Sequence, residues 1–112
     1  MEKIFEKTLL YDFYGELLTE HQQEIYENVV FDDMSLSEAA AEFGVSRQGI
    51  HDMIRRCDKA LEEYEEKLHM VEQFEKIKKY TENMRTLLLL GESGDKKQEL
   101  LDLTEKILGE LE

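Results

Sequence analysis

One apolar stripe constrains the fold of this chain more than any other feature of its sequence. Apolar residues recur at alternating steps of four and three, at Ile50, Ile54, Cys57, Leu61, Tyr64, Leu68 and Val71. This heptad spacing is typical of a helix that packs along one side. The chain has no proline, and no glycine interrupts residues 50–90. The pattern predicts one helix from Ser46 to about Leu90, roughly 65 Å long, and is also compatible with a kink after Lys67.

Start and stop signals divide the rest of the chain into further helices. A first helix is expected over residues 3–14, with Gly15 as its stop. A second helix is expected from Thr19, which forms a capping box with Gln22, to about Phe31. The sequence GESGD, residues 91–95, predicts a loop before a last helix, whose apolar face would contain Leu100, Leu101, Leu103, Ile107, Leu108 and Leu111.

The segment SLSEAAAEFGVSRQGIHDMIRRC, from Ser35 to Cys57, predicts two helices joined by a tight turn. Ser35 and Glu38 form a second capping box, which starts a short helix. Gly44 can adopt the left-handed conformation that turns the chain, and Ser46 is expected to cap the next helix. This is the layout of a helix-turn-helix, in which the second helix presents its first residues to a nucleic-acid groove.

The second helix of this motif carries the candidate contacts to nucleic acid. Val45, Ile50 and Ile54 are expected to anchor it from below, which leaves its polar side chains exposed. Arginine bonds guanine bidentately and glutamine bonds adenine, while free amides at a helix start hold phosphate. The predicted contact residues are Ser46, Arg47, Gln48, His51, Arg55, Arg56 and Lys59. Asp52 on the same face would repel phosphate, and a helix pair that only packs is the alternative interpretation.

Together these elements predict an all-α fold, a helix-turn-helix bundle with a long helix and a C-terminal helix. Residues 1–62 would hold the N-terminal helices and the helix-turn-helix. Residues 63–112 would hold the extension of the long helix and the C-terminal helix, within a single structural unit.

Acidic residues dominate the chain, which has a formal net charge of -13. Residues 15–33 carry six acids and no Lys or Arg, whereas residues 46–60 carry four basic residues against two acids. A negative field around the whole molecule repels polyanions, so we expect poor non-specific affinity for nucleic acid. The basic segment can still dock locally. The acidic segment is either a solvated helix face or a surface for a basic partner.

The inventory of reactive side chains argues against an enzyme. Glu66 and His69 form one ExxH pair, whereas a di-iron bundle needs two. Cys57 lies on the apolar stripe and is expected to be a small buried residue, and GESGD lacks the Lys-Ser/Thr of a P-loop. We expect no catalytic residue, no cofactor and no metal. The start MEKIFEKTLL has no signal-peptide core and no apolar run approaches the ~20 residues of a membrane span, which favours a cytoplasmic protein.

Three segments, in this order and spacing, resemble the YlxM family of bacterial proteins: YDFYGELLTEHQ, SLSEAAAEFGVSRQGIHDMIRR and EEYEEKL. The resemblance covers about residues 9–68, more than half of the chain. It implies a small helical DNA-binding protein whose helix-turn-helix is similar to region 4 of sigma factors. The family's genes lie beside that of the signal recognition particle GTPase, so the resemblance also implies a role in that targeting pathway. Gly49 departs from the family pattern, in which we expect alanine.

The apolar stripe extends beyond the part that the rest of the chain can cover. We therefore predict a homodimer whose interface contains Tyr64, Leu68, Val71 and Phe74. Two functions stay open: an accessory or regulatory component of the signal recognition particle pathway that binds its RNA, its GTPase or both, and a sequence-specific DNA-binding transcriptional regulator. About four phosphate contacts hold random DNA weakly at cellular salt, which favours the accessory role.

Overall fold

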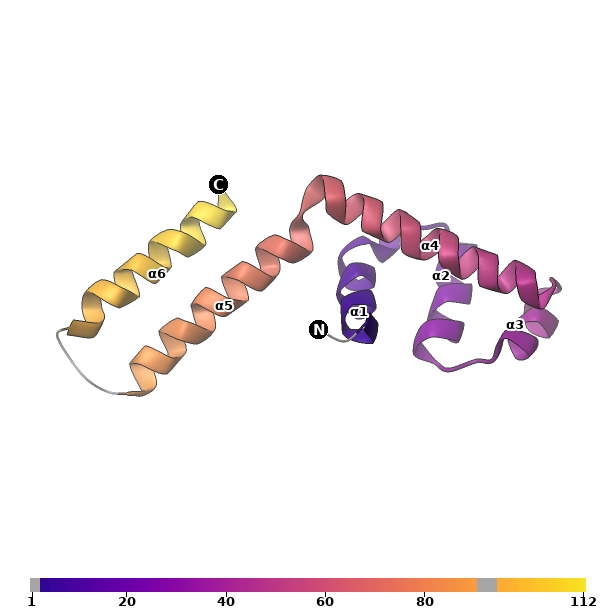
Figure 1. Ribbon diagram of the computed structural model, residues 1–112, viewed down its shortest axis with the longest axis horizontal. Coiled ribbons are helices and arrows are strands. Elements are labelled where there is room, and N and C mark those ends of the chain that lie inside the picture. Colours follow the sequence, from indigo (N-terminus) through magenta and orange to yellow (C-terminus); the bar gives the residue numbers. More distant parts are fainter. Residues whose placement is uncertain (1–2, 91–94) are drawn as a thin grey trace. The chain divides into compact units, whose positions relative to one another are not determined.

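The computed structural model describes residues 3–90 and 95–112, which form helices and no strand (Figure 1). The all-α prediction is therefore confirmed. The chain divides into two compact units, Met1–Leu68 and His69–Glu112. Of the loop predicted at residues 91–95, residues 91–94 lie outside the described residues, and Asp95 is the first residue of α6. No helix in the described part of the chain is long and apolar enough to cross a membrane.

The first unit packs its N-terminal elements against one helix. Its elements are α1 (Lys3–Tyr14), the 3₁₀ helix η1 (Gly15–Leu17), α2 (Glu20–Tyr26), the π-helix η2 (Glu27–Phe31), α3 (Leu36–Phe43) and α4 (Arg47–Leu68). Helices α1, α2 and α3 each contact α4 (Figure 1). The boundaries expected for the first helix and for the short helix of the helix-turn-helix agree with α1 and α3.

A small apolar core joins the two helices of the helix-turn-helix to α2. Ile25, Ala39 and Ile50 are buried and pack together. The side chain of Ala39 is a single methyl group, so α3 can approach α4 closely. Around these three lie the half-buried side chains of Val29, Met34, Leu36, Ala40, Phe43, Met53 and Ile54.

Val45 does not anchor α4 as expected, because its side chain is 45% exposed. The backbone of Val45 closes the turn instead, because its N–H donates to the carbonyl of Ala40 at 3.1 Å. Gly44 is left-handed, with φ of 67°, and ends α3 in the way the sequence predicts. The core below α4 is filled instead by Ile50 and by the half-buried Ile54.

The predicted helix caps are present. Thr19 and Gln22 form a complete capping box, as do Ser35 and Glu38. The hydroxyl oxygen of Ser46 accepts the N–H of Gly49 at 2.9 Å. The starts of α2, α3 and α4 are therefore fixed by local hydrogen bonds that the sequence encodes.

Tyrosine hydroxyls join the N-terminal helices to α4 and to one another. Tyr26, which is fully buried, donates to Asp58 at 2.6 Å, and the Lys7 ammonium lies 3.3 Å from the other oxygen of that carboxylate. Tyr11 stacks on Tyr26 with 5.3 Å between ring centroids and donates to Glu27 at 2.5 Å. Burial, and then the hydrogen bond to Asp58, raise the pKa of Tyr26 well above its ordinary value of 10.0.

Gly15 follows the last residue of α1, but not as a left-handed stop. The chain continues into η1, and a Cβ at this position would lie 3.0 Å from the ring of Tyr11. The glycine is needed for this close approach, because the ring of Tyr11 is held by its stacking on Tyr26.

The buried side of α4 contains the first half of the apolar stripe. Ile50, Cys57 and Leu61 are fully buried, as expected for the part of the stripe that the same chain covers. Burial raises the pKa of the Cys57 thiol to about 11, so it stays protonated at neutral pH. Cys57 is therefore the small buried residue that the sequence predicts.

The single long helix predicted from Ser46 to Leu90 is wrong, because the helix is interrupted at His69, in the region after Lys67 where the sequence also allowed a kink. Helix α4 ends at Leu68, and His69 is left-handed, with φ of 54°. Histidine adopts this region more often than most non-glycine residues. Its carbonyl accepts the N–H of Gln73 at 3.0 Å, so His69 also starts the next helix.

The second unit is a pair of antiparallel helices, α5 (Met70–Leu89) and α6 (Asp95–Leu111) (Figure 1). Polar contacts join them: Lys76 lies 3.7 Å from Glu110, and the Gln73 side chain donates to the carbonyl of Glu110. The apolar face predicted for the last helix is divided. Leu100, Leu103 and Ile107 are half-buried, whereas the exposed members are Leu101, Leu108 and Leu111.

Alkaline pH should destabilise the protein through Tyr26. A raised folded-state pKa contributes stability that is complete below the unfolded value of about 10 and declines as pH rises above it. We expect the free energy of unfolding in urea to fall between pH 8 and pH 11. Tyr26→Phe should unfold more easily at pH 8, by about 1 kcal/mol, and lose less between the two pH values. An equal loss in Tyr26→Phe and the wild type would contradict this role, and Tyr80→Phe is the control.

Gly49→Ala should stabilise the protein. A Cβ at this position would lie 3.2 Å from the Ser46 hydroxyl oxygen. Gln22 and Glu38 occupy the equivalent position of the other two caps and carry a Cβ, so this cap geometry accepts one. Because alanine is the better helix former, we expect the free energy of unfolding to rise by about 0.5–1 kcal/mol. A lower midpoint in urea would show instead that the Ser46 side chain cannot move to make room for the added Cβ.

Candidate nucleic-acid interface

All seven residues predicted to contact nucleic acid lie on the surface at the start and first half of α4. Residues 47, 51 and 55 follow one another at steps of four, and residues 48, 52, 55 and 59 form the neighbouring row. The exposed side chains are Ser46, Arg47, Gln48, His51, Arg55, Arg56 and Lys59. They share one side of the helix because the other side, with Ile50, Cys57 and Leu61, is buried in the core.

Two shallow hollows follow this surface. The first is lined by Leu36, Arg47, Gln48 and His51. The second, further along α4, is lined by Asp52, Arg55, Arg56 and Lys59. Leu36 packs against the core and is half-buried, and it also borders the first hollow. An apolar side chain beside Arg47 and Gln48 offers a contact for a thymine methyl group.

Asp52 interacts with its neighbours on the surface. The side-chain amide of Gln48 donates to its Oδ1 at 2.9 Å. The Nδ1 of His51 lies 3.9 Å from the same oxygen. The negative charge predicted to weaken binding therefore also orients Gln48, whose second N–H and carbonyl oxygen can still bond the edge of a base.

Ser46 combines a structural role with a predicted contact. Its oxygen accepts the N–H of Gly49, which leaves the hydroxyl proton as a donor. A donor at a helix start is suited to phosphate because the helix dipole favours negative charge there.

The four residues predicted to form a dimer interface differ in their exposure. Tyr64 is half-buried, with its ring centroid 6.0 Å from that of Tyr14. Leu68, the last residue of α4, is 53% exposed. In the second unit Val71 is 8% exposed and Phe74 is 40% exposed.

Comparison with known proteins gives a family for this fold and interface. The family model described as "Putative helix-turn-helix protein, YlxM / p13 like" matches residues 1–107. A UPF0122 protein of Halalkalibacterium halodurans is 41% identical over 110 residues, which is 96% of this chain and 95% of the relative. One of Symbiobacterium thermophilum is 44% identical over 102 residues, covering 91% and 83%. One of Thermoanaerobacter pseudethanolicus is 37% identical over 105 residues, covering 94% and 90%. The chain therefore belongs to the UPF0122 family of YlxM/p13-like helix-turn-helix proteins.

Proposed function

We propose that this chain is a non-enzymatic, cytoplasmic nucleic-acid-binding protein that acts as an accessory component of the signal recognition particle pathway. The observation that carries nucleic-acid binding is the exposed basic surface on the first half of α4, within a helix-turn-helix. The proposed contacts are Ser46, Arg47, Gln48, His51, Arg55, Arg56 and Lys59. The proposed likeness to region 4 of sigma factors would place the start of α4 in a groove.

The charge distribution supports an accessory role over general DNA binding. The contact surface offers four cationic side chains, Arg47, Arg55, Arg56 and Lys59, on a chain of net charge -13. Four phosphate contacts give a salt slope of about -3 to -4, and such binding is weak at cellular salt. A structured RNA held together with a protein partner would supply the missing affinity.

The acidic segment supports the protein partner. Its carboxylates Glu16, Glu20, Glu24, Glu27, Asp32 and Asp33 are all exposed. They lie on α2 and in the segments directly before and after it, whereas the basic residues lie on α4. A basic protein surface, such as the one that the YlxM resemblance suggests for the targeting GTPase, would dock on the acidic segment without competing for α4.

A second candidate is a sequence-specific transcriptional regulator, which the orientation of Gln48 by Asp52 favours. A glutamine side chain that is held in place by its neighbour can distinguish one base from another, as a sequence-specific regulator requires. In either role the chain is proposed to act as a homodimer, with the exposed Leu68 among the predicted interface residues. A dimer presents two copies of α4.

The double variant Arg47→Ala/Arg55→Ala should lose nucleic-acid binding and keep its helix content, because both side chains are exposed. We expect the affinity for signal recognition particle RNA, measured by fluorescence anisotropy, to fall at least about tenfold and the salt slope to lose roughly two contacts. The control Lys78→Ala/Lys79→Ala removes the same charge from exposed positions of α5. Unaltered binding by the Arg47/Arg55 variant would place the contact elsewhere.

A competition separates the two candidate functions. Labelled protein is mixed with assembled signal recognition particle and an excess of genomic DNA fragments at about 0.15 M salt, where the screening length is about 8 Å. We expect the particle to retain the label, because four phosphate contacts hold random duplex weakly. If one DNA fragment takes the label and the particle does not compete, the protein is a regulator and the accessory role is wrong.

A further inference from the structure

The second unit has too little core for two helices that stand alone. It contains 44 residues, and Val71, at 8% exposed, is the one buried apolar residue among its described positions. The half-buried side chains between α5 and α6 form a contact between two helices and not a core enclosed on several sides. Units of this size are usually stabilised by association, and an antiparallel helix pair is half of a four-helix bundle.

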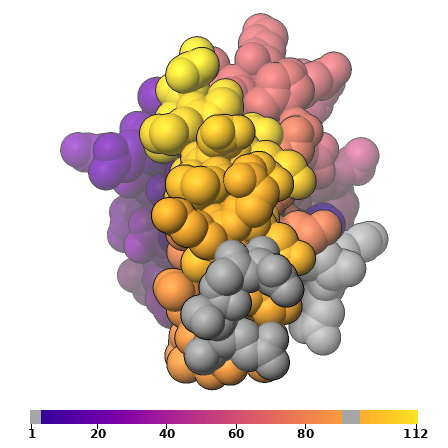
Figure 2. Space-filling model, turned by 90° about the vertical axis from the view of Figure 1, so that its left-hand side faces the viewer, coloured from indigo at the N-terminus to yellow at the C-terminus, as the bar shows by residue number. Residues whose placement is uncertain are grey.

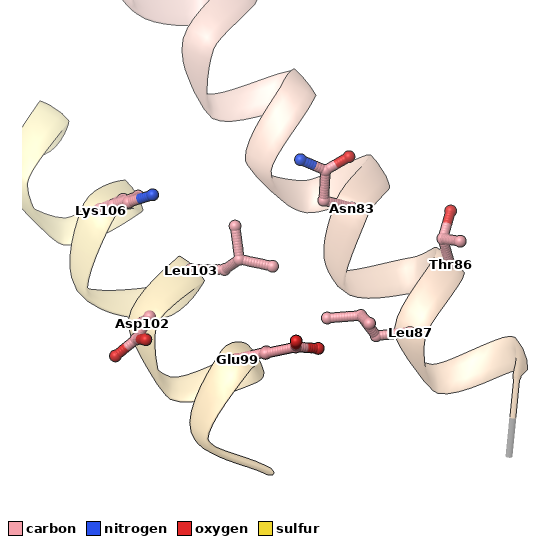
Figure 3. Close-up of a pocket in the computed structure, with 7 residues that line it drawn as sticks. All are labelled: Asn83, Thr86, Leu87, Glu99, Asp102, Leu103 and Lys106. Carbon is pink, nitrogen blue, oxygen red and sulfur yellow. The ribbon is translucent and has the colours of Figure 1, made fainter. Parts of the chain in front are cut away.

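One face of this helix pair is polar. Lys76 bridges to Glu110, and Lys106 lies over the ring of Tyr80 at 5.9 Å from its centroid. Beyond them lies an open cleft in which Leu87 and Leu103 point toward one another (Figure 3). The remaining lining residues carry polar atoms: Asn83, Thr86, Glu99, Asp102 and Lys106.

The face away from this cleft carries an apolar row of α6, beside the exposed Glu105. Leu101, Leu108 and Leu111 are 47%, 59% and 63% exposed, and their spacing of seven and three places them in one row on α6. A rotation of about 100° per residue turns this row roughly 80–160° away from Leu103. Figure 2 shows α6, in yellow, at the surface of the unit along its length.

We infer that a second copy of this chain docks on the apolar face of α6, with the two α6 helices antiparallel across a twofold axis. The two helix pairs then form a four-helix bundle, and the leucine row of each copy packs against that of the other. This inference rests on the homodimer of the proposed function and places its interface on α6.

Charge favours a second copy in this orientation. Lys97 is exposed and continues the leucine row, four residues before Leu101. In an antiparallel pair, a step of four residues back along one helix matches a step of four residues forward along the other. When Leu101 lies opposite Leu108 of the second copy, Lys97 therefore lies opposite Glu112 of the second copy. Twofold symmetry repeats this ion pair at the other end. A parallel arrangement would bring Lys97 against Lys97, so these end charges pair only when the two helices are antiparallel.

The first test measures the mass of the full chain by sedimentation equilibrium at about 10 μM. The wild type should show twice the mass of the chain, and Leu108→Lys should show the single mass. Leu17→Lys is the matched control, because Leu17 is 55% exposed in the first unit, and it should stay dimeric. A dimeric Leu108→Lys would overturn the α6 interface and leave the proposed homodimer intact, whereas a monomeric wild type would overturn both.

Charge reversal tests the orientation independently of any loss of folding in Leu108→Lys. Lys97→Glu and Glu112→Lys should each weaken dimerisation about tenfold, since each replaces two ion pairs by two repulsions. The combined variant Lys97→Glu/Glu112→Lys should restore wild-type dimerisation. Single variants that behave like the wild type, or a combined variant that is no better than the single ones, would overturn the antiparallel pairing.

Discussion

The burial of one side of α4 is the constraint on which the candidate interface depends. Ile50, Cys57 and Leu61 are fully buried, and they contact a core built from α1, α2 and α3. Because these residues fix the rotation of α4 about its axis, the opposite side must face solvent. Arg47, His51 and the other candidate contacts are exposed as a consequence of this packing.

One of the two acids of this region is used within the fold, which makes the surface of α4 more basic than the sequence suggests. Residues 46–60 carry a formal charge of only +2, because Asp52 and Asp58 offset four basic side chains. Yet Asp58 turns toward the core side, where it accepts the Tyr26 hydroxyl and pairs with Lys7. Asp52 keeps its charge at the surface of α4, where the side-chain amide of Gln48 donates to it. Arg47, Arg55 and Arg56 therefore present a locally positive surface on an acidic protein, which suits selective contacts better than general affinity.

Local chemistry made much of the first unit predictable from the sequence. Capping boxes at Thr19 and Ser35 and the left-handed Gly44 fixed helix boundaries, because each depends on residues within a few positions. The exposure of the predicted contact side chains between Arg47 and Lys59 follows from the period of the buried stripe, which places them on the other side of the helix. Val45 was misplaced because its exposure depends on how the turn is closed by a backbone hydrogen bond to Ala40.

The second unit shows why a continuous apolar period does not establish a continuous helix. The stripe from Ile50 passes through Val71 without a change of register, and neither glycine nor proline marks the break at His69. The contacts of α5 with α6 use another register, with Gln73, Tyr80 and Leu87 at steps of seven. A helix with apolar residues in two registers has two sides to cover. One side of α5 is covered by α6, and Ile77, which lies between Gln73 and Tyr80 on that side, is half-buried. The exposed leucines of α6 lie outside this contact. The proposed second copy would cover these leucines with the same row of its own α6.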